Sequence, residues 1–128
     1  LATLERALAL PSVKTYPMLR FELYTTLAVA QIAMGRLDLA SDALVTEPKM
    51  EGLSRWAEFE RDLVDGYRLL FSGDVAAARA VATRLEPQVA PFVMYRELTL
   101  RLCSATDGST APDQVPALLW VGAAPLSA

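Results

Sequence analysis

One short pattern occurs twice in this chain and constrains its fold more than any other feature. The stretch MGRLDLASDAL, from Met34, and the stretch FSGDVAAARAV, from Phe71, each contain a glycine that is followed by an alanine five residues later. The two glycines, at positions 35 and 73, are 38 residues apart, and Gly108 follows 35 residues after the second. A period of this size is typical of repeated helical hairpins. The pattern therefore predicts a helical repeat.

The spacing of apolar residues around these glycines predicts the individual helices. From Pro17, apolar side chains recur every three or four residues, so we expect a long helix over residues 17–34. Gly35 supplies a left-handed turn, and we expect Asp38 to cap a second helix that ends before Pro48. The same order of elements is expected over residues 54–72 and 75–86, with Gly73 and Asp74 between them. A further helix is expected over 91–106, and the first eleven residues should form another return helix.

The end of the chain differs from the rest. Residues 107–128 contain three prolines and the apolar run ALLWVGAAPL, which is too short to cross a bilayer as a helix. We therefore expect a helical repeat domain over residues 1–106. The Pro-containing apolar tail over residues 107–128 should pack on that domain or be partly disordered.

Composition limits the environment and the partners. The net charge is −3 with a pI near 4.9, which argues against nucleic acid as a partner, because nonspecific affinity for it comes from Lys and Arg. No apolar run is long enough to indicate a membrane partner. The single cysteine, Cys103, excludes an internal disulfide, so we expect a cytoplasmic protein. The preference for Arg over Lys suggests a bacterial source. A start at Leu1 suggests a piece of a longer chain.

The repeated pattern resembles the tetratricopeptide repeat (TPR) family, in which each repeat is a pair of antiparallel helices. A large residue, a Leu and a small residue mark the first helix of that repeat, a Gly ends it and an Ala opens the second. The residues that match these packing positions are Tyr24, Leu27, Ala28, Gly35 and Ala40 in one repeat, and Gly66, Gly73 and Ala78 in the next. The first eleven residues, LATLERALALP, resemble a second helix of the family. Asp62 and Asp65 depart from its pattern.

The resemblance implies an all-α fold. Antiparallel helix hairpins would stack as a short right-handed α-α superhelix of about six helices, followed by the C-terminal tail. The small residues are expected to let neighbouring helices approach closely. An irregular helical bundle is the alternative, because close packing of antiparallel helices also requires small residues.

Residues that could carry chemistry are few. The chain has no His, which removes the commonest general base and many metal sites. Cys103 lies in an apolar helical run and is expected to be a packed thiol. Glu58, Asp62 and Asp65 share one helical face and could hold a cation, but neighbouring arginines favour ordinary ion pairs on a solvated face. We therefore expect no enzyme activity, no catalytic or metal-binding residues and no cofactor.

The resemblance also implies a binding face, because the first helices of TPR hairpins line a groove. The residues at those positions are Glu22, Thr25, Val29, Leu63, Tyr67, Leu70, Tyr95, Leu98 and Leu102. This set lacks the Lys and Asn side chains of family members that hold a peptide's terminal carboxylate. Its Leu, Tyr and Val side chains suit an amphipathic helix or an apolar extended segment. Alternatively the same residues are core, and the segment over 118–121 covers them.

Three functions follow as hypotheses. The first is a noncatalytic protein-interaction module or scaffold that binds a helix or apolar peptide segment of another protein, or of its own parent chain. The second is a sensory or regulatory domain of a bacterial transcription regulator or signalling ATPase, with a small apolar effector in the same cavity. The third is homo-oligomerisation through the repeat ends or the tail.

Overall fold

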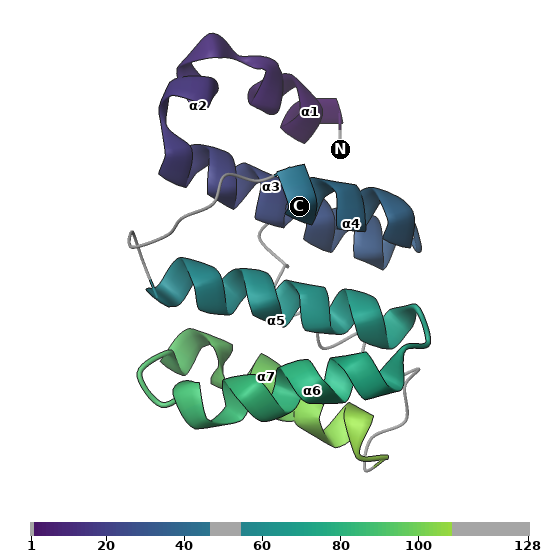
Figure 1. Cartoon of the computed structure of the whole chain (residues 1–128). Coiled ribbons are helices and arrows are strands. Elements are labelled where there is room, and N and C mark those ends of the chain that lie inside the picture. The colour runs from purple at the N-terminus through teal and green to yellow at the C-terminus, as the bar shows by residue number, and fades with distance from the viewer. Residues whose placement is uncertain (1, 47–54, 109–128) are drawn as a thin grey trace. The chain divides into compact units, whose positions relative to one another are not determined.

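The structure, a computed structural model, describes residues 2–46 and 55–108, and every regular element in these ranges is a helix (Figure 1). The predicted all-α class is therefore confirmed. The chain divides into two compact units, one up to Arg61 and the other from Asp62. This boundary falls within one helix. The predicted right-handed stacking of the hairpins stays a prediction.

In its described residues, 2–46 and 55–61, the first unit contains four helices and the start of a fifth. They are α1 (Ala2–Ala9), α2 (Pro11–Thr15), α3 (Pro17–Ala33), α4 (Leu37–Thr46) and the first residues of α5 (Arg55–Phe71). Helix α4 turns back along α3, and α1 packs against α3. Phe21 of α3 and Ala57 of α5 form a buried cluster with the half-buried Trp56, whose ring centroid lies 6.4 Å from that of Phe21. The core of this unit therefore lies along one side of α3.

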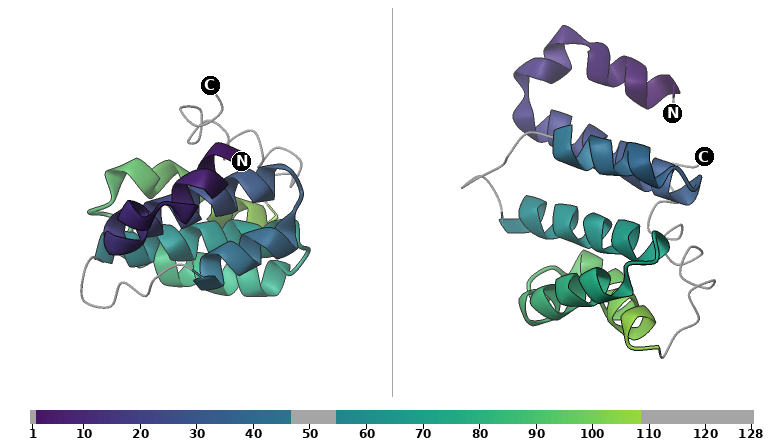
Figure 2. Two further views of the ribbon diagram at one scale, coloured as in Figure 1. Left: turned by 90° about the horizontal axis from the view of Figure 1, so that it is seen from above. Right: turned by 45° about the vertical axis from the view of Figure 1, so that its right-hand side comes forward.

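The second unit contains the rest of α5 and the elements that follow it. These are α6 (Val75–Leu85), the short 3₁₀ helices η1 (Glu86–Gln88) and η2 (Val93–Tyr95), and α7 (Arg96–Thr106). Helix α6 returns along α5, and α7 packs against α6 (Figure 2). The predicted segments over 54–72 and 75–86 are thus confirmed as helices. The segment expected over 91–106 is also helical, but its α-helix begins later, at Arg96, after η2.

The two hairpins turn in the same way. Gly35 has a φ of +74° and Gly73 a φ of +91°, the left-handed region that glycine enters without a side-chain clash. The amide of Gly35 donates to the Ile32 carbonyl at 3.0 Å, and that of Arg36 donates to the Gln31 carbonyl at 2.8 Å. Around Gly73 the same pair of hydrogen bonds closes α5, from Gly73 to the Leu70 carbonyl and from Asp74 to the Leu69 carbonyl. Both turns are Schellman motifs, so the predicted helix ends are confirmed.

The start of the return helix differs between the hairpins. Asp74 precedes α6, and its carboxylate accepts a hydrogen bond from the Ala77 amide at 3.2 Å, as predicted for a cap. The prediction that Asp38 caps α4 is wrong, because α4 begins at Leu37 and Asp38 lies inside its first turn. Arg36 stands before the helix instead, and its carbonyl accepts from the Ala40 amide at 3.1 Å. Asp38 can still interact favourably with the positive end of the helix dipole.

The small residues of the repeat pattern lie at close helix contacts. Ala28, Ala40 and Ala78 are fully buried, and Gly66 is buried in the second unit. A Cβ atom placed on Gly66 would lie 2.7 Å from Cδ2 of Leu102 and 3.0 Å from Cγ1 of Val81. Helices α6 and α7 therefore approach α5 at a point where any added side chain would displace Leu102 or Val81. Of the remaining repeat-packing residues, Leu27 is buried, Tyr24 is half-buried, and Gly35 and Gly73 are exposed at the turns.

The beginning of the chain contains one element that the apolar spacing does not predict. Residues 1–11 are expected to form one return helix that ends near Pro11, whereas α1 ends at Ala9 and Pro11 opens the separate helix α2. Proline is favoured at the first position of a helix because the amide it lacks would have no intrahelical partner. The Thr15 hydroxyl donates to the Pro11 carbonyl at 3.0 Å and helps to close this short helix.

Candidate binding face

The predicted groove residues divide between the two units. Glu22, Thr25 and Val29 lie on α3 in the first unit, and the rest lie on α5, on α7 and in η2 in the second. Thr25, Leu63, Tyr67, Leu70 and Leu102 are buried, whereas Glu22, Val29, Tyr95 and Leu98 are half-buried. The structure brings together members within each unit, and the two sets are therefore considered separately.

In the second unit the predicted groove residues form core. Tyr67 is 0% exposed, and its hydroxyl donates a hydrogen bond to the Leu98 carbonyl on α7. Burial raises the pKa of the Tyr67 phenol, so this side chain stays neutral. Leu102 is also 0% exposed and faces Gly66. On this side of α5, Leu63, Tyr67, Leu70 and Leu102 are packed beneath α7. The groove expected for the whole set stays a prediction, and the 118–121 segment that was the alternative cover lies outside the described residues.

In the first unit the corresponding face of α3 is less covered. Met18, Glu22, Val29 and Ala33 recur at helical spacing and lie within a narrow arc of the helix, which we call the inner stripe. Met18 is 40% exposed, and the other three side chains are half-buried. Thr25, at the edge of this arc, is buried. The inner stripe is therefore a mainly apolar strip with one carboxylate, and it keeps part of its surface in contact with solvent.

The carboxylate of Glu22 is the one ionisable group of the inner stripe. Desolvation by burial raises its pKa above the ordinary value of 4.5. No hydrogen bond or ion pair joins Glu22 to another residue in the described ranges. The neighbouring cation along the helix, Arg20, lies 5.6 Å from the ring centroid of Tyr24 and makes a cation–π contact there. Glu22 is therefore a partly desolvated charge without a partner in the described chain.

The repeat allows the two faces to be compared position by position. Residues 38 apart occupy the same place in each hairpin, so Val29 corresponds to Tyr67 and Ala33 to Phe71. The Tyr67 and Phe71 rings lie 6.1 Å apart between centroids and fill the face of α5. Valine and alanine at the same positions of α3 leave that volume unfilled by their own side chains. The difference in side-chain size therefore distinguishes the inner stripe from its counterpart.

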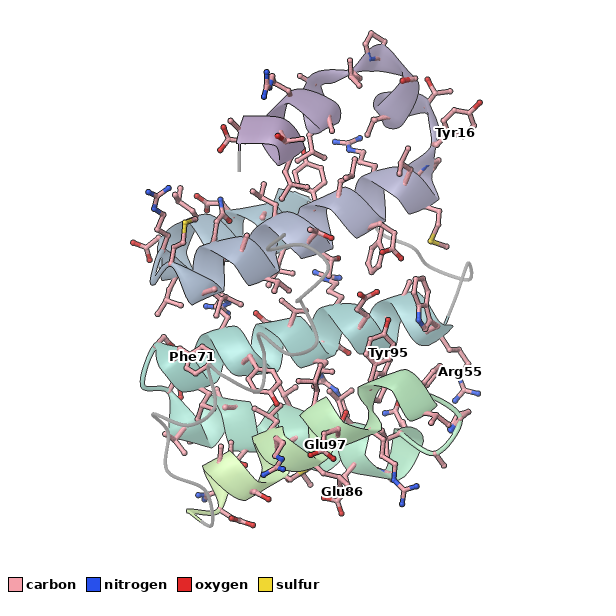
Figure 3. All side chains as sticks on the ribbon, turned by 180° about the vertical axis from the view of Figure 1, so that it is seen from behind. Tyr16, Arg55, Phe71, Glu86, Tyr95 and Glu97 are labelled. Carbon is pink, nitrogen blue, oxygen red and sulfur yellow. The ribbon has the colours of Figure 1, made fainter. Side chains whose placement is uncertain are left out.

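Other large apolar side chains are exposed near the start of α3. Tyr16 is 61% exposed and projects away from the helices, as Figure 3 shows, and Leu10 and Leu19 are also exposed. None of the three belongs to the predicted groove, and Tyr16 and Leu10 lie outside the long helices. Leu10 and Tyr16 flank the short helix α2, and Leu19 lies in the first turn of α3.

The remaining candidates for chemistry have structural roles. Burial, together with the Glu86 carboxylate, raises the pKa of the half-buried Cys103 thiol to about 12, so the thiol stays protonated at neutral pH. Its sulfur lies 3.9 Å from the Ala82 carbonyl oxygen on α6. These contacts agree with the expected packed thiol.

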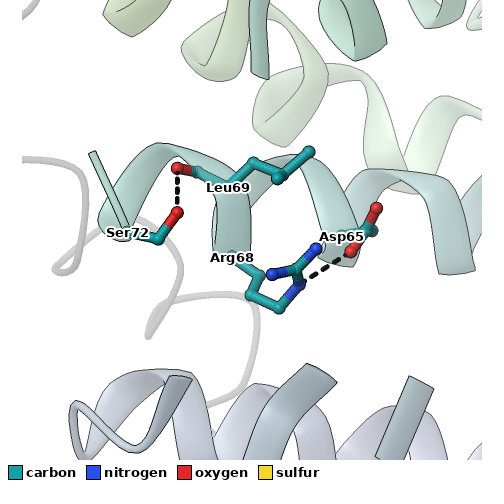
Figure 4. A network of polar contacts seen from close by, with 4 residues as sticks. All are labelled: Asp65, Arg68, Leu69 and Ser72. Carbon is teal, nitrogen blue, oxygen red and sulfur yellow. Dashed lines mark hydrogen bonds and ion pairs between the residues drawn. The ribbon is translucent and has the colours of Figure 1, made fainter. Parts of the chain in front are cut away.

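Two acidic residues of α5, Asp62 and Asp65, are paired with arginines. Nε of Arg68 lies 2.8 Å from Oδ1 of Asp65 (Figure 4), and Nη2 of Arg84 lies 3.3 Å from Oδ2 of Asp62. Within residues 2–46 and 55–108, no three side chains of the metal-binding types come together. In the same ranges, no helix combines the length and hydropathy that crossing a bilayer requires.

Comparisons with family models, with curated proteins and with solved structures found no match to this chain. The resemblance to tetratricopeptide repeats therefore rests on the residues quoted above.

Proposed function

We propose that the chain is a noncatalytic protein-interaction module that binds an apolar helical segment along the inner stripe of α3. The segment belongs to another protein or to another part of the parent chain. The observation that carries this proposal is the contrast between Val29, which is half-buried, and its counterpart Tyr67, which is fully buried beneath α7. The half-buried face of α3 offers apolar surface that a bound helix would cover further.

The dimensions of the inner stripe suit a helical partner. It extends from Met18 to Ala33, which at a rise of 1.5 Å per residue is a length of roughly 22 Å. This is about four turns, enough for an amphipathic helix to place apolar side chains at positions i, i+3 or i+4, and i+7. Met18 adds a flexible side chain that can adapt to different apolar surfaces.

The proposal includes a TPR-like architecture. Two features support it: the identical Schellman turns at Gly35 and Gly73, and the buried alanines at positions 40 and 78. In a stack of such hairpins the inner faces of the first helices would line one continuous side. The half-buried thiol of Cys103 suits a reducing compartment such as the cytoplasm. The effector-binding and self-association hypotheses stay predictions.

A substitution on the inner stripe tests the proposal. Val29→Asp places a second carboxylate in the middle of the stripe, and it should abolish binding of helical peptides that are selected on the wild-type chain. Ala80→Asp is the matched control, because Ala80 is exposed on α6 and gains the same charge. Circular dichroism checks that both variants keep their helices. Equal binding by the wild type and Val29→Asp, with the fold intact, would contradict the assignment of this face.

A further inference from the structure

We infer that the segment bound on the inner stripe carries a Lys or Arg side chain within its apolar face, and that this cation pairs with Glu22. This inference rests on the proposed function and specifies the chemistry of the partner. Glu22 becomes the residue that selects among apolar helices, whereas Met18, Val29 and Ala33 supply the apolar contact.

The environment of Glu22 in the described chain supports this pairing. Its side chain is half-buried and has no hydrogen bond or ion pair within residues 2–46 and 55–108. A helix laid along the stripe would remove more water from the carboxylate, and burying an unpaired charge is strongly unfavourable. A purely apolar helix would therefore bind with a penalty at this point. A cation within hydrogen-bonding reach offsets that penalty and adds a charge-assisted hydrogen bond.

Two segments that could bind on the inner stripe, the chain's own C-terminal segment and a separate helix, can be distinguished by their charges. The chain's own C-terminal segment, residues 109–128, contains no Lys or Arg, and its single ionisable side chain is the carboxylate of Asp113. It can cover apolar surface but cannot neutralise Glu22. A separate basic, amphipathic helix matches both the apolar residues and the charge of the inner stripe.

A displayed peptide library provides the test. The probe is a set of 18-residue helical peptides with Leu at four positions of one face and with the other positions of that face randomised. A helix of about 18 residues covers the length of the inner stripe and extends roughly one turn beyond it. Selection is carried out on the full wild-type chain and in parallel on Glu22→Gln, which has nearly the same shape and no charge. Peptides recovered on the wild type should carry Lys or Arg on the apolar face, and peptides recovered on Glu22→Gln should not.

Affinities of one recovered peptide give the quantitative result. Replacing its basic residue by norleucine should weaken binding to the wild type by about tenfold, the loss expected for a hydrogen bond to a charged group. The same replacement should have no effect on binding to Glu22→Gln. Glu22→Lys should reverse the preference and favour a peptide with Glu at that position.

The failure of this inference differs from the failure of the proposed function. If peptides bind the inner stripe and lose affinity with Val29→Asp, but the basic residue makes no difference, the pairing with Glu22 is wrong and the binding face stands. If no peptide is enriched on the wild type over Val29→Asp, both are overturned. A third outcome combines no peptide enrichment with a change in Trp120 fluorescence that occurs in Val29→Asp and not in Glu22→Gln. This outcome would assign the inner stripe to the chain's own C-terminal segment, and it would also overturn the inference.

Discussion

The two hairpins share a turn and a helix length but differ in what covers their first helix. Helices α3 and α5 are both 17 residues long, and both end in a Schellman motif at a left-handed glycine. Buried residues recur 38 positions apart, as in Phe21 and Phe59. In the second hairpin, however, Tyr67 is hydrogen-bonded to the Leu98 carbonyl on α7, whereas Val29 of the first hairpin remains half-buried.

This difference shows how one repeat can serve two purposes. In the second unit the inner face of α5 is used for stability, because large rings fill it and α7 closes it. In the first unit the same face of α3 carries smaller side chains and a carboxylate. Binding surfaces commonly keep exposed apolar area that the folded chain does not need for its own core. The predictions below test this division, from the largest expected effect to the smallest.

The largest effect is expected at the buried tyrosine. Tyr67→Ala should lower the free energy of unfolding by about 3–5 kcal/mol, because it removes a fully buried ring and its hydrogen bond to α7. Val29→Ala, at the equivalent position of α3, should cost only about 1 kcal/mol, since a half-buried valine contributes less apolar burial. Urea unfolding followed by circular dichroism measures both. Equal losses would remove the distinction between the two faces.

The next effect concerns the close approach of helices in the second unit. Gly66→Val should destabilise the chain by about 1–3 kcal/mol, because the added atoms overlap Leu102 and Val81. Combining it with Leu102→Ala should cost less than the sum of the two separate losses, since the smaller side chain makes room. Thermal unfolding of the four proteins in this cycle gives the coupling. Simple additivity would mean that the contact at Gly66 is not tight in solution.

A smaller effect is expected at the caps, where the hairpins differ by one side chain. Asp74→Ala should cost about 1 kcal/mol by removing the acceptor for the Ala77 amide. Arg36→Asp should instead stabilise the first hairpin, by up to about 1 kcal/mol, because it places a capping carboxylate where none exists. Melting temperatures of the two variants should move in opposite directions. A fall for Arg36→Asp would show that Arg36 has another stabilising role.

The smallest effect is a pH dependence at Glu22. Its pKa in the folded chain is raised above 4.5, so the folded state binds this proton more tightly than the unfolded state does. Protonated Glu22 therefore stabilises the folded state at a pH below the pKa that Glu22 has in the unfolded chain. This stabilisation is lost as the pH rises through the pKa of Glu22 in the folded chain. Glu22→Gln should therefore gain stability relative to the wild type between pH 4 and pH 7. Urea midpoints at the two pH values measure this change, and a relative gain by the wild type would contradict it.

Much of the helical pattern could be predicted because local chemistry determines it. Gly35 and Gly73 adopt a backbone conformation that other residues avoid, and Pro17 opens α3 as proline prefers to do. The positions of the turns follow from these residues without knowledge of tertiary contacts. The same local reasoning failed at Asp38, because the Schellman turn places Arg36, two residues earlier, at the start of α4.

The coverage of the candidate site could not be predicted in the same way. A tyrosine at position 67 suits a groove as well as a core, and only the placement of α7 decides between them. That placement depends on η1, η2 and the close contact at Gly66, which involve residues far apart in the chain. Helical periodicity identifies which residues share a face, but it does not show which faces another helix covers.

The central claim is that the inner stripe of α3 is the binding face and that the inner face of α5 is core. Methyl-labelled NMR spectra of the full chain, recorded with and without a peptide selected on it, test this claim directly. The account predicts that the signals of Met18 and Val29 shift on binding while those of Leu63 and Leu102 stay in place. Shifts at Leu63 and Leu102, with Met18 and Val29 unchanged, would contradict it.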